Sequence, residues 1–401
     1  MSAGQGSDPI VIVGAARTPM GGFQGELAGV TAPELGSAAI SAALSRAGVP
    51  AADVDEVLMG CVLPHGLKQA PARQAAIGAG LPTSVPCTTV NKMCGSGMKT
   101  VMQGYDALAA GTLGDGGIVV AGGMESMTNT PYVLPRVREG LRMGHGDVKD
   151  AMFLDGLENA YDGRLMGSFA EDTARELQFT REAQDAYAIE SLRRANQAIA
   201  EGSFEEEIVP VTVKSRKGET VVAVDEQPGN AAPDKIPSLK PAFAPDGSVT
   251  AANSSSISDG GSALVLMNQS TATARGLKPL ARIVGHATHA RDPEWFTTAP
   301  IGAIQTLMAR TGWNLADVDL FEINEAFAVV TLAAMRELDL PHEKVNVHGG
   351  ACALGHPVGS SGSRIIVTLI SALRKYGGRK GVAALCIGGG EATAVAVELI
   401  D

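Results

Sequence analysis

Two glycine-containing turns decide how this chain folds: Cys94-Gly-Ser-Gly (residues 94–97) and Gly355-His-Pro-Val-Gly-Ser-Ser-Gly (residues 355–362). Each is followed by apolar residues at helical spacing. Each helical pattern then leads into a strand-like run that ends in a second turn, GIVVAGGMES (117–126) and GVAALCIGGGEA (381–392). This repeated layout predicts a duplicated α/β unit.

The rest of the chain supports an α/β fold with buried strands. Short apolar and β-branched runs alternate with helical patterns, as expected for strands separated by helices. The predicted strands are Ile10–Val13, Glu56–Leu63, Gly117–Ala121, Ala281–Val284, Leu320–Ile323, Val345–Val347 and Gly381–Ile387.

Between Met124 and Ser256 the pattern changes to charged helices such as Glu171–Glu201 and a loop rich in Pro and Gly over Asp225–Pro245. We interpret this segment as an insertion into the first half, although an independent third domain fits the pattern too. The expected division is residues 1–123 with 257–281 as the first half, 124–256 as the insertion and 282–401 as the second half.

Composition narrows the class of protein. The 401 residues are 45% apolar and carry a net charge of −11, which does not favour nucleic acid as a partner. No apolar stretch is long enough for a transmembrane helix, and MSAGQGSDPI does not resemble a leader, so we expect a cytoplasmic protein without membrane contact. The five cysteines are widely spread, which predicts reduced thiols, and no spacing is typical of a metal site.

Two residues at the glycine turns could carry chemistry. Cys94 lies directly before a helix, where free N–H groups and the helix dipole favour a thiolate, although a buried cysteine is often only a small apolar residue. His356 is expected on a loop at the edge of the sheet, where it suits a general base, although a loop histidine is often merely solvated.

Other candidates lie where predicted strands end. Cys386 precedes Gly388-Gly-Gly at the end of an apolar strand and suggests a second reactive thiol. Asn324 follows the strand Leu320–Ile323, and is either an amide at the site or a helix cap. Cys352 is interpreted as packing.

Five motifs together resemble the thiolase superfamily, and the acetyl-CoA acetyltransferases within it: NKMCGSGMK (91–99), VVAGGMESM (119–127), NEAFA (324–328), GGACALGHPVGSSG (349–362) and CIGGG (386–390). The resemblance runs over nearly the whole chain. It implies the thiolase fold, with two similar α/β halves in five layers, α/β/α/β/α, and an inserted loop domain that covers coenzyme A. It further implies acyl-CoA thioesters as substrates, no permanently bound cofactor and a homotetramer.

The resemblance also assigns roles. Cys94 would accept the acyl group and His356 would activate it, while Cys386 would remove the α-proton of the second acetyl-CoA. Asn324, through a water, and His356 would stabilise the enolate oxygen. The backbone N–H groups of Cys94 and Gly388 would hold the oxygen of the tetrahedral intermediate.

Substrate-binding residues follow by the same resemblance. Ser255 matches a serine that binds the pantetheine, and Met166 matches a methionine that lines the pocket. Leu165 stands where short-chain biosynthetic relatives usually carry a histidine, so one polar contact differs. The loop 225–233 lacks the family's aromatic and arginine residues, so the CoA phosphates must be held by other cations, for which the candidates are Lys214, Arg216, Lys217 and Lys235.

The expected reaction is the interconversion of two acetyl-CoA with acetoacetyl-CoA and CoA. A 3-ketoacyl-CoA thiolase of fatty-acid degradation, with a longer acyl pocket, remains an alternative. A decarboxylating ketoacyl synthase is disfavoured because Cys386 supplies a second thiol. A non-catalytic acyl-CoA carrier is disfavoured because Cys94 and His356 are both present.

Overall fold

The computed structural model describes residues 8–216 and 218–400. The residues Met1–Ser7, on which the expectation of no leader partly rests, and the candidate cation Lys217 lie outside the described part. Among the described helices, none combines the length and the apolar character that crossing a bilayer requires.

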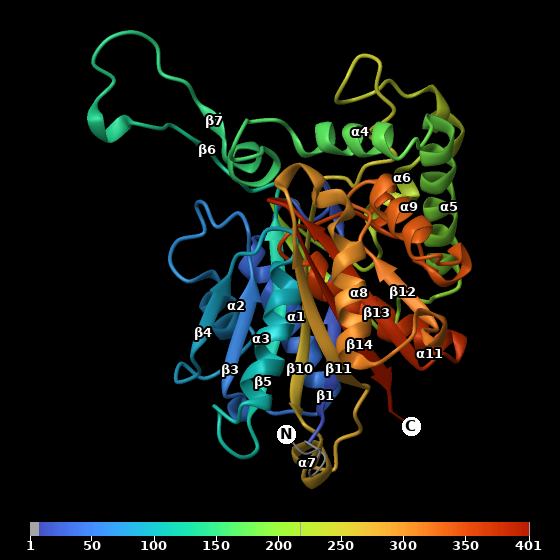
Figure 1. Ribbon diagram of the computed structural model, residues 1–401. Helices are drawn as coiled ribbons and strands as arrows, with labels where there is room; N and C mark the ends of the chain where they lie inside the picture. Colours follow the sequence, from blue (N-terminus) through green and yellow to red (C-terminus); the bar gives the residue numbers. More distant parts are fainter. Residues whose placement is uncertain (1–7, 217, 401) are drawn as a thin grey trace.

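A ten-stranded mixed sheet runs through the molecule (Figure 1). A short strand, β2 (Gly21–Gly22), pairs with β10 and stands outside the main strand order. The order of the other strands is β12 (Leu320–Ile323), β13 (Lys380–Ile387), β14 (Glu391–Leu399), β11 (Ala281–Ala290), β1 (Ile10–Arg17), β10 (Ser258–Asn268), β5 (Ile118–Ser126), β3 (Glu56–Gly60) and β4 (Cys87–Val90).

The sheet consists of two similar halves. In the first, β3 is parallel to β4 and β5, β5 is antiparallel to β10, and β10 is antiparallel to β1. In the second, β12 is parallel to β13, β13 is antiparallel to β14, and β14 is antiparallel to β11. A parallel bridge between Phe321 and Val345 stands where β4 does in the first half. The predicted duplication is confirmed.

Helices complete five layers. On the outer side of the first half lie α1 (Ala32–Ala47) and α2 (Pro71–Gly78), and on that of the second lie α8 (Ala299–Thr311) and α9 (Ala328–Glu337). The two helices that follow the glycine turns, α3 (Ser96–Ala109) and α11 (Ser361–Tyr376), share one apolar cluster with strands of both halves. They form the central layer, so the predicted α/β/α/β/α order is confirmed.

The glycines let these central helices begin in contact. A Cβ atom at Gly362 would lie 2.4 Å from the backbone nitrogen of Met98. One at Gly97 would lie 2.6 Å from the hydroxyl of Ser363. Because only a residue without a side chain tolerates such an approach, the two turns are held against each other. They therefore meet at one place in the molecule.

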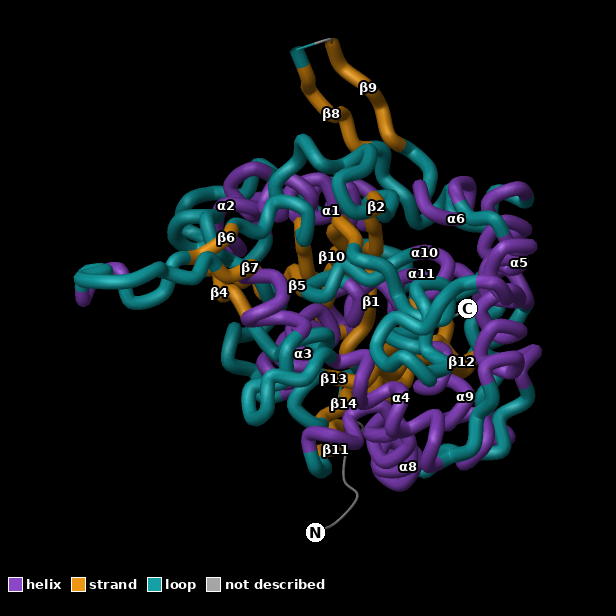
Figure 2. Tube along the Cα trace, turned by 90° about the horizontal axis from the view of Figure 1, so that it is seen from above, coloured by secondary structure: helices purple, strands orange, loops and turns teal. Residues whose placement is uncertain are grey.

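The insertion between β5 and β10 packs on both halves. Two antiparallel hairpins, β6–β7 and β8–β9, project from the body (Figures 1 and 2). Along the chain, the two longer helices α4 and α5 lie between these hairpins. Residues of α5 share an apolar cluster with Met20 and Leu354, which belong to different halves. Its elements are β6 (Tyr132–Val133), β7 (Lys149–Asp150), α4 (Met166–Glu176), α5 (Arg181–Ala200), β8 (Val211–Ser215), β9 (Gly218–Val222) and α6 (Glu226–Asn230).

Some details differ from the sequence-based expectations. The predicted strand Val345–Val347 is reduced to the bridge at Val345, and the helical stretch Glu171–Glu201 is interrupted between α4 and α5. The strand β10 had no strand prediction, because its run SDGGSALVLM starts with small and polar residues that show no period of two. Remaining short helices include α7 (Gln269–Ala274) and α10 (Ala351–Leu354).

Candidate active site

The turn before α3 places Cys94 at the start of a buried helix. Its geometry is strained at Met93, which has φ 47° although it is not glycine. Side chains hold this conformation: Asn91 Oδ1 accepts from the Met93 N–H at 3.0 Å, and Ser96 Oγ accepts from the Lys92 N–H at 2.8 Å. Strain that is stabilised by several specific contacts is typical of a functional site.

The Cys94 thiol is half-buried and lies beside the glycine turn after β13. Burial raises the pKa of Cys94, while the N–H groups of Gly388 and of Cys94 itself act in the opposite direction and the charge of Glu125 raises it further. The expectation that the helix start lowers the thiol pKa is therefore wrong, because desolvation outweighs the donors. The free thiol is neutral and needs a base.

His356 supplies a base that is neutral at physiological pH. The residue is buried, and its backbone N–H lies 3.2 Å from the Ser256 carbonyl oxygen and 3.1 Å from Ser258 Oγ. Burial, followed by the charge of Arg364, lowers the pKa of His356 to about 3. The alternative of a solvated loop histidine is excluded by this burial.

Hydrogen bonds define which imidazole nitrogen carries the proton. Ser361 Oγ lies 3.0 Å from the Pro357 carbonyl oxygen, to which it donates its only proton. Ser361 Oγ also lies 2.6 Å from His356 Nδ1. Because its own proton is already used, Ser361 Oγ accepts a hydrogen bond from Nδ1–H. Nε2 is then the unprotonated nitrogen, and it has no partner among the described residues. It is the atom available to take a proton.

The second thiol lies next to the first. Cys386 is fully buried at the end of β13, and its pKa is raised well above its ordinary value by burial and by the nearby Cys94. Two residues later, the backbone N–H of Gly388 is close enough to the Cys94 sulfur to lower the pKa of that thiol. A Cβ atom at Gly388 would lie 3.4 Å from the sulfur of Met166, the first residue of α4. Cys94, Cys386, Gly388 and Met166 are thus brought together.

Asn324 is not a helix cap, because the cap position of α9 is occupied by Phe327. Its backbone N–H pairs with the Ala384 carbonyl at 3.0 Å, whereas neither polar atom of its buried side chain has a partner among the described residues. A buried amide without partners is costly unless a ligand or water satisfies it. The site interpretation of Asn324 is therefore favoured.

Two buried carboxylates hold the loops of the site and were missed by sequence reasoning. Glu125, in VVAGGMESM, accepts from the backbone N–H groups of Val62 at 2.9 Å, Leu63 at 3.2 Å and Gly359 at 3.0 Å. It thus ties the His356 loop to the first half. Burial raises the pKa of Glu125 to about 7.

Glu325, in NEAFA, holds the insertion to the second half. It accepts from Tyr187 Oη and Ser191 Oγ on α5, each at 2.8 Å, and from the Cys352 N–H at 3.0 Å. An acidic residue at the end of an apolar strand is the signal that could have identified both carboxylates, and Glu325 also directly follows the candidate Asn324.

The predicted substrate-binding residues lie around this centre. The Ser255 N–H donates to the Ala326 carbonyl at 2.9 Å, which places the serine loop beside the Asn324 segment. Leu165 occupies the cap position of α4 and precedes Met166. Both Ser255 and Leu165 are partly exposed, as contacts to a ligand require.

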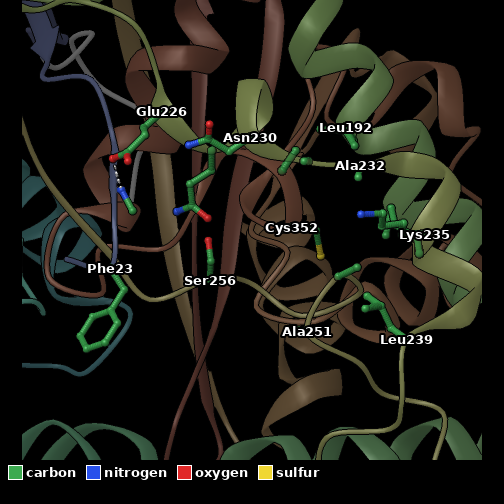
Figure 3. A pocket seen from close by; sticks show the side chains of 17 residues that line it. Phe23, Leu192, Glu226, Asn230, Ala232, Lys235, Leu239, Ala251, Ser256 and Cys352 are labelled. Atoms are coloured by element: carbon green, nitrogen blue, oxygen red, sulfur yellow. Dashed lines mark hydrogen bonds between the residues drawn. The ribbon is translucent and has the colours of Figure 1, made fainter. Parts of the chain in front are cut away.

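A cavity of about 510 Å³ adjoins the serine loop (Figure 3). Its wall includes Ser256, whose carbonyl accepts from the His356 N–H, and Cys352. Leu192 and Leu239 make the wall partly apolar, and Lys235 points its amino group toward the cavity. The carboxylate of Glu226 also lines the cavity, and apart from the candidate cation Lys235, none of the predicted catalytic or substrate-binding residues does. Among the described residues, no cluster of His, Cys, Asp and Glu could hold a metal ion.

Relatives of the chain share this architecture. Family models for the thiolase N-terminal domain and the thiolase C-terminal domain match residues 10–270 and 277–399. The chain is 51% identical to acetyl-CoA acetyltransferase 2 of Arabidopsis thaliana, covering 98% of this chain and 97% of the relative. It is 49% identical to the cytosolic acetyl-CoA acetyltransferase of Mus musculus, covering 98% and 99%.

Solved structures agree with the fold. The acetyl-CoA acetyltransferase of Bacillus anthracis superposes with a TM-score of 0.95 at 41% identity, covering 99% of this chain and 100% of that chain. The Acat5 thiolase of Ascaris suum in complex with coenzyme A superposes with a TM-score of 0.91 at 42% identity, covering 98% and 100%. Together with the paired thiols and the duplicated sheet, these matches show that the chain belongs to the thiolase family.

Proposed function

We propose that this protein is an acetyl-CoA C-acetyltransferase, which interconverts two acetyl-CoA with acetoacetyl-CoA and CoA through an acyl group on Cys94. The observation that carries the proposal is the proximity of two thiols, Cys94 and Cys386, beside the turn at Gly388. The names of the relatives in plants, mammals and bacteria support the same activity.

The first half-reaction needs deprotonation of a neutral thiol. His356 Nε2 takes the proton of Cys94 as the sulfur attacks the thioester carbonyl of the first acetyl-CoA, so a separate imidazolium and thiolate need not form against their pKa values. The N–H groups of Cys94 and Gly388, which act on the sulfur in the free enzyme, turn to the carbonyl oxygen as it gains negative charge. The C–S bond to CoA breaks, and the departing thiolate takes the proton back from His356.

In the second half-reaction, Cys386 acts as the base for carbon–carbon bond formation. The neutral Cys386 thiol passes its proton to His356 as its sulfur takes the α-proton of the second acetyl-CoA, and Asn324 and the resulting imidazolium stabilise the enolate oxygen. The enolate carbon attacks the acyl group on Cys94, the bond between that carbonyl and the Cys94 sulfur breaks to release acetoacetyl-CoA, and the freed Cys94 thiolate takes the proton that His356 holds. Unpartnered polar atoms on Asn324 and His356 support this role.

The proposed ligands are coenzyme A thioesters, with no permanently bound cofactor. The cavity of Figure 3, whose wall includes Ser256 next to Ser255, is proposed for the part of the ligand that lies away from the thiols. Among the candidate cations for the CoA phosphates, Lys235 lines this cavity, whereas Lys214 lies on the projecting hairpin β8–β9 and faces Glu219. Ser255 would bind the pantetheine, and Met166 and Leu165 would line the path toward Cys94. The CoA complex of the Ascaris suum thiolase supports a CoA ligand.

Assembly and location are part of the proposal. A homotetramer is supported by apolar side chains on the projecting β6–β7 arm, including Leu141, Val148 and Met143, the last 97% exposed. A cytoplasmic location is supported by the cytosolic relative from Mus musculus. The division into residues 1–123 with 257–281, 124–256 and 282–401 is retained as a proposal.

A broader-chain 3-ketoacyl-CoA thiolase is the second candidate, because Leu165 makes the approach to the thiols more apolar than the histidine of short-chain relatives would. The test is cleavage of acetoacetyl-CoA by CoA, followed as loss of the enolate absorbance, beside a 3-ketoacyl-CoA of longer chain. Faster cleavage of acetoacetyl-CoA is expected. Preference for the longer substrate would assign the broader thiolase, and cleavage of neither would overturn both.

A further inference from the structure

The turn that carries Cys94 lies against the turn that carries Gly388. The backbone N–H of Gly388 is close enough to the Cys94 sulfur to lower the pKa of that thiol. The neighbouring residues are in contact too: a Cβ atom at Gly95, which follows Cys94, would lie 2.3 Å from Cδ1 of Ile387, which precedes Gly388. The two segments are therefore packed directly against each other. The catalytic geometry depends on this contact, because the two turns come from different halves of the molecule.

An ion pair crosses the same boundary. The Lys92 ammonium donates to the Glu391 carboxylate, and the two residues flank the contact on both sides. Lys92 lies two residues before Cys94, and Glu391 follows the last glycine of the turn and begins β14. The side chains are 22% and 35% exposed, so water screens the pair only partly.

Each partner is anchored by its own half. The Lys92 N–H donates to Ser96 Oγ, which fixes the lysine to the start of α3. Glu391 pairs in register with Ile387 of β13 and with Ala290 of β11. The ion pair therefore joins two rigid supports directly across the reacting atoms.

We propose that Lys92 and Glu391 are positioning residues for the thiolase reaction, which hold the Gly388 N–H at the distance from Cys94 that stabilises the oxyanion. This inference rests on the proposed function. A preorganised donor is effective only when it does not have to move as charge develops. A slip between the halves by a fraction of an ångström would misplace this donor, whereas substrate binding, which involves other residues, would be little changed.

The test uses the full-length protein and acetoacetyl-CoA with free CoA. Lys92→Met and Glu391→Gln each remove one charge and keep most of the side-chain volume. Removing a whole oxyanion donor costs on the order of 10²- to 10³-fold in kcat, so loosening one should lower kcat by about tenfold. The KM for acetoacetyl-CoA should stay within about twofold. The exchanged pair Lys92→Glu with Glu391→Lys should recover most of the lost rate.

A distant pair serves as the matched control. Arg275, beside α7 at the far end of the molecule (Figure 1), pairs with Asp53 at 2.6 Å, and both are 36% exposed. Arg275→Met should leave kcat unchanged. The inference is overturned if both single variants keep kcat within twofold of the wild type, or if the exchanged pair is no faster than the single variants. An inactive wild type would instead overturn the proposed function.

Discussion

The two glycine turns occupy corresponding places in the two halves, yet they present different chemistry. The first links β4 to α3 and contains a left-handed Met93 directly before a half-buried thiol. The second links the bridge at Val345 to α11 and contains a buried imidazole whose Nδ1 is bonded to Ser361. The duplicated scaffold therefore determines the position of each reactive group. The side chains around each group determine its protonation.

The ends of the corresponding strands β5 and β13 differ in the same way. Glu125, near the end of β5, is bonded to three backbone N–H groups and holds loops in place. Cys386, near the end of β13, lies beside a second thiol instead. One half thus supplies support and the nucleophile, and the other supplies both proton-transferring groups.

The largest expected effect separates the two thiols. Cys386→Ser should lower turnover by roughly 10²- to 10⁴-fold, the usual contribution of a general acid–base group, while Cys94 still accepts an acetyl group. Intact-mass measurement after mixing with acetyl-CoA would detect the acyl-enzyme. The matched control, Cys94→Ser, should lose acylation as well. Equal loss of acylation and turnover in Cys386→Ser would contradict the division of roles between the halves.

A smaller effect concerns the His356 tautomer. Ser361→Ala removes the acceptor of Nδ1–H, so the proton can move to Nε2, and kcat should fall by about 10- to 100-fold, as for other residues that orient a functional group. Ser361→Thr keeps a hydroxyl and should restore most of the activity. A purely structural role would instead lower thermal stability in step with kcat.

The state of His356 also predicts how the rate of Cys94 acylation depends on pH. Because the pKa of His356 is lowered to about 3, the imidazole of the wild type stays unprotonated from about pH 5 upward. Protonation of His356 should therefore cause no fall in the rate of Cys94 acylation between pH 8 and pH 5. An acid limb near pH 6.5 that disappears when His356 is replaced would show that the imidazole is more exposed to water than the structure indicates.

The last comparison concerns stability at the two ends of α11. Gly362→Ala should destabilise the fold by about 3 kcal/mol, because its Cβ would lie 2.4 Å from the Met98 backbone, which cannot move away easily. Gly377→Ala should cost only about 1 kcal/mol, because φ there is 69° but no atom lies within 4 Å of the new Cβ. Urea unfolding measures both, and equal costs would show that the contact between the central helices can relax.

The sequence by itself determined the duplicated α/β architecture, the strands β1, β3, β5, β11, β12 and β13, and the family. Apolar runs of fixed period and glycine turns are local signals, so Ile10–Val13, Leu320–Ile323 and the two helix starts could be recognised without the fold. The candidate residues Cys94, His356, Cys386 and Asn324 were recognised because each interrupts such a pattern at a turn or strand end.

Only the tertiary structure decided the electrostatics and the long-range contacts. The pKa of Cys94 depends on how much of the thiol is buried and on an N–H group 294 residues further along, at Gly388, and no local pattern encodes either. The hydrogen bonds that Glu125 and Glu325 accept likewise join segments that are distant in the chain. Burial and contacts between distant residues arise only when the halves pack, which is why the helix start alone predicted a lowered pKa for Cys94, whereas burial raises it.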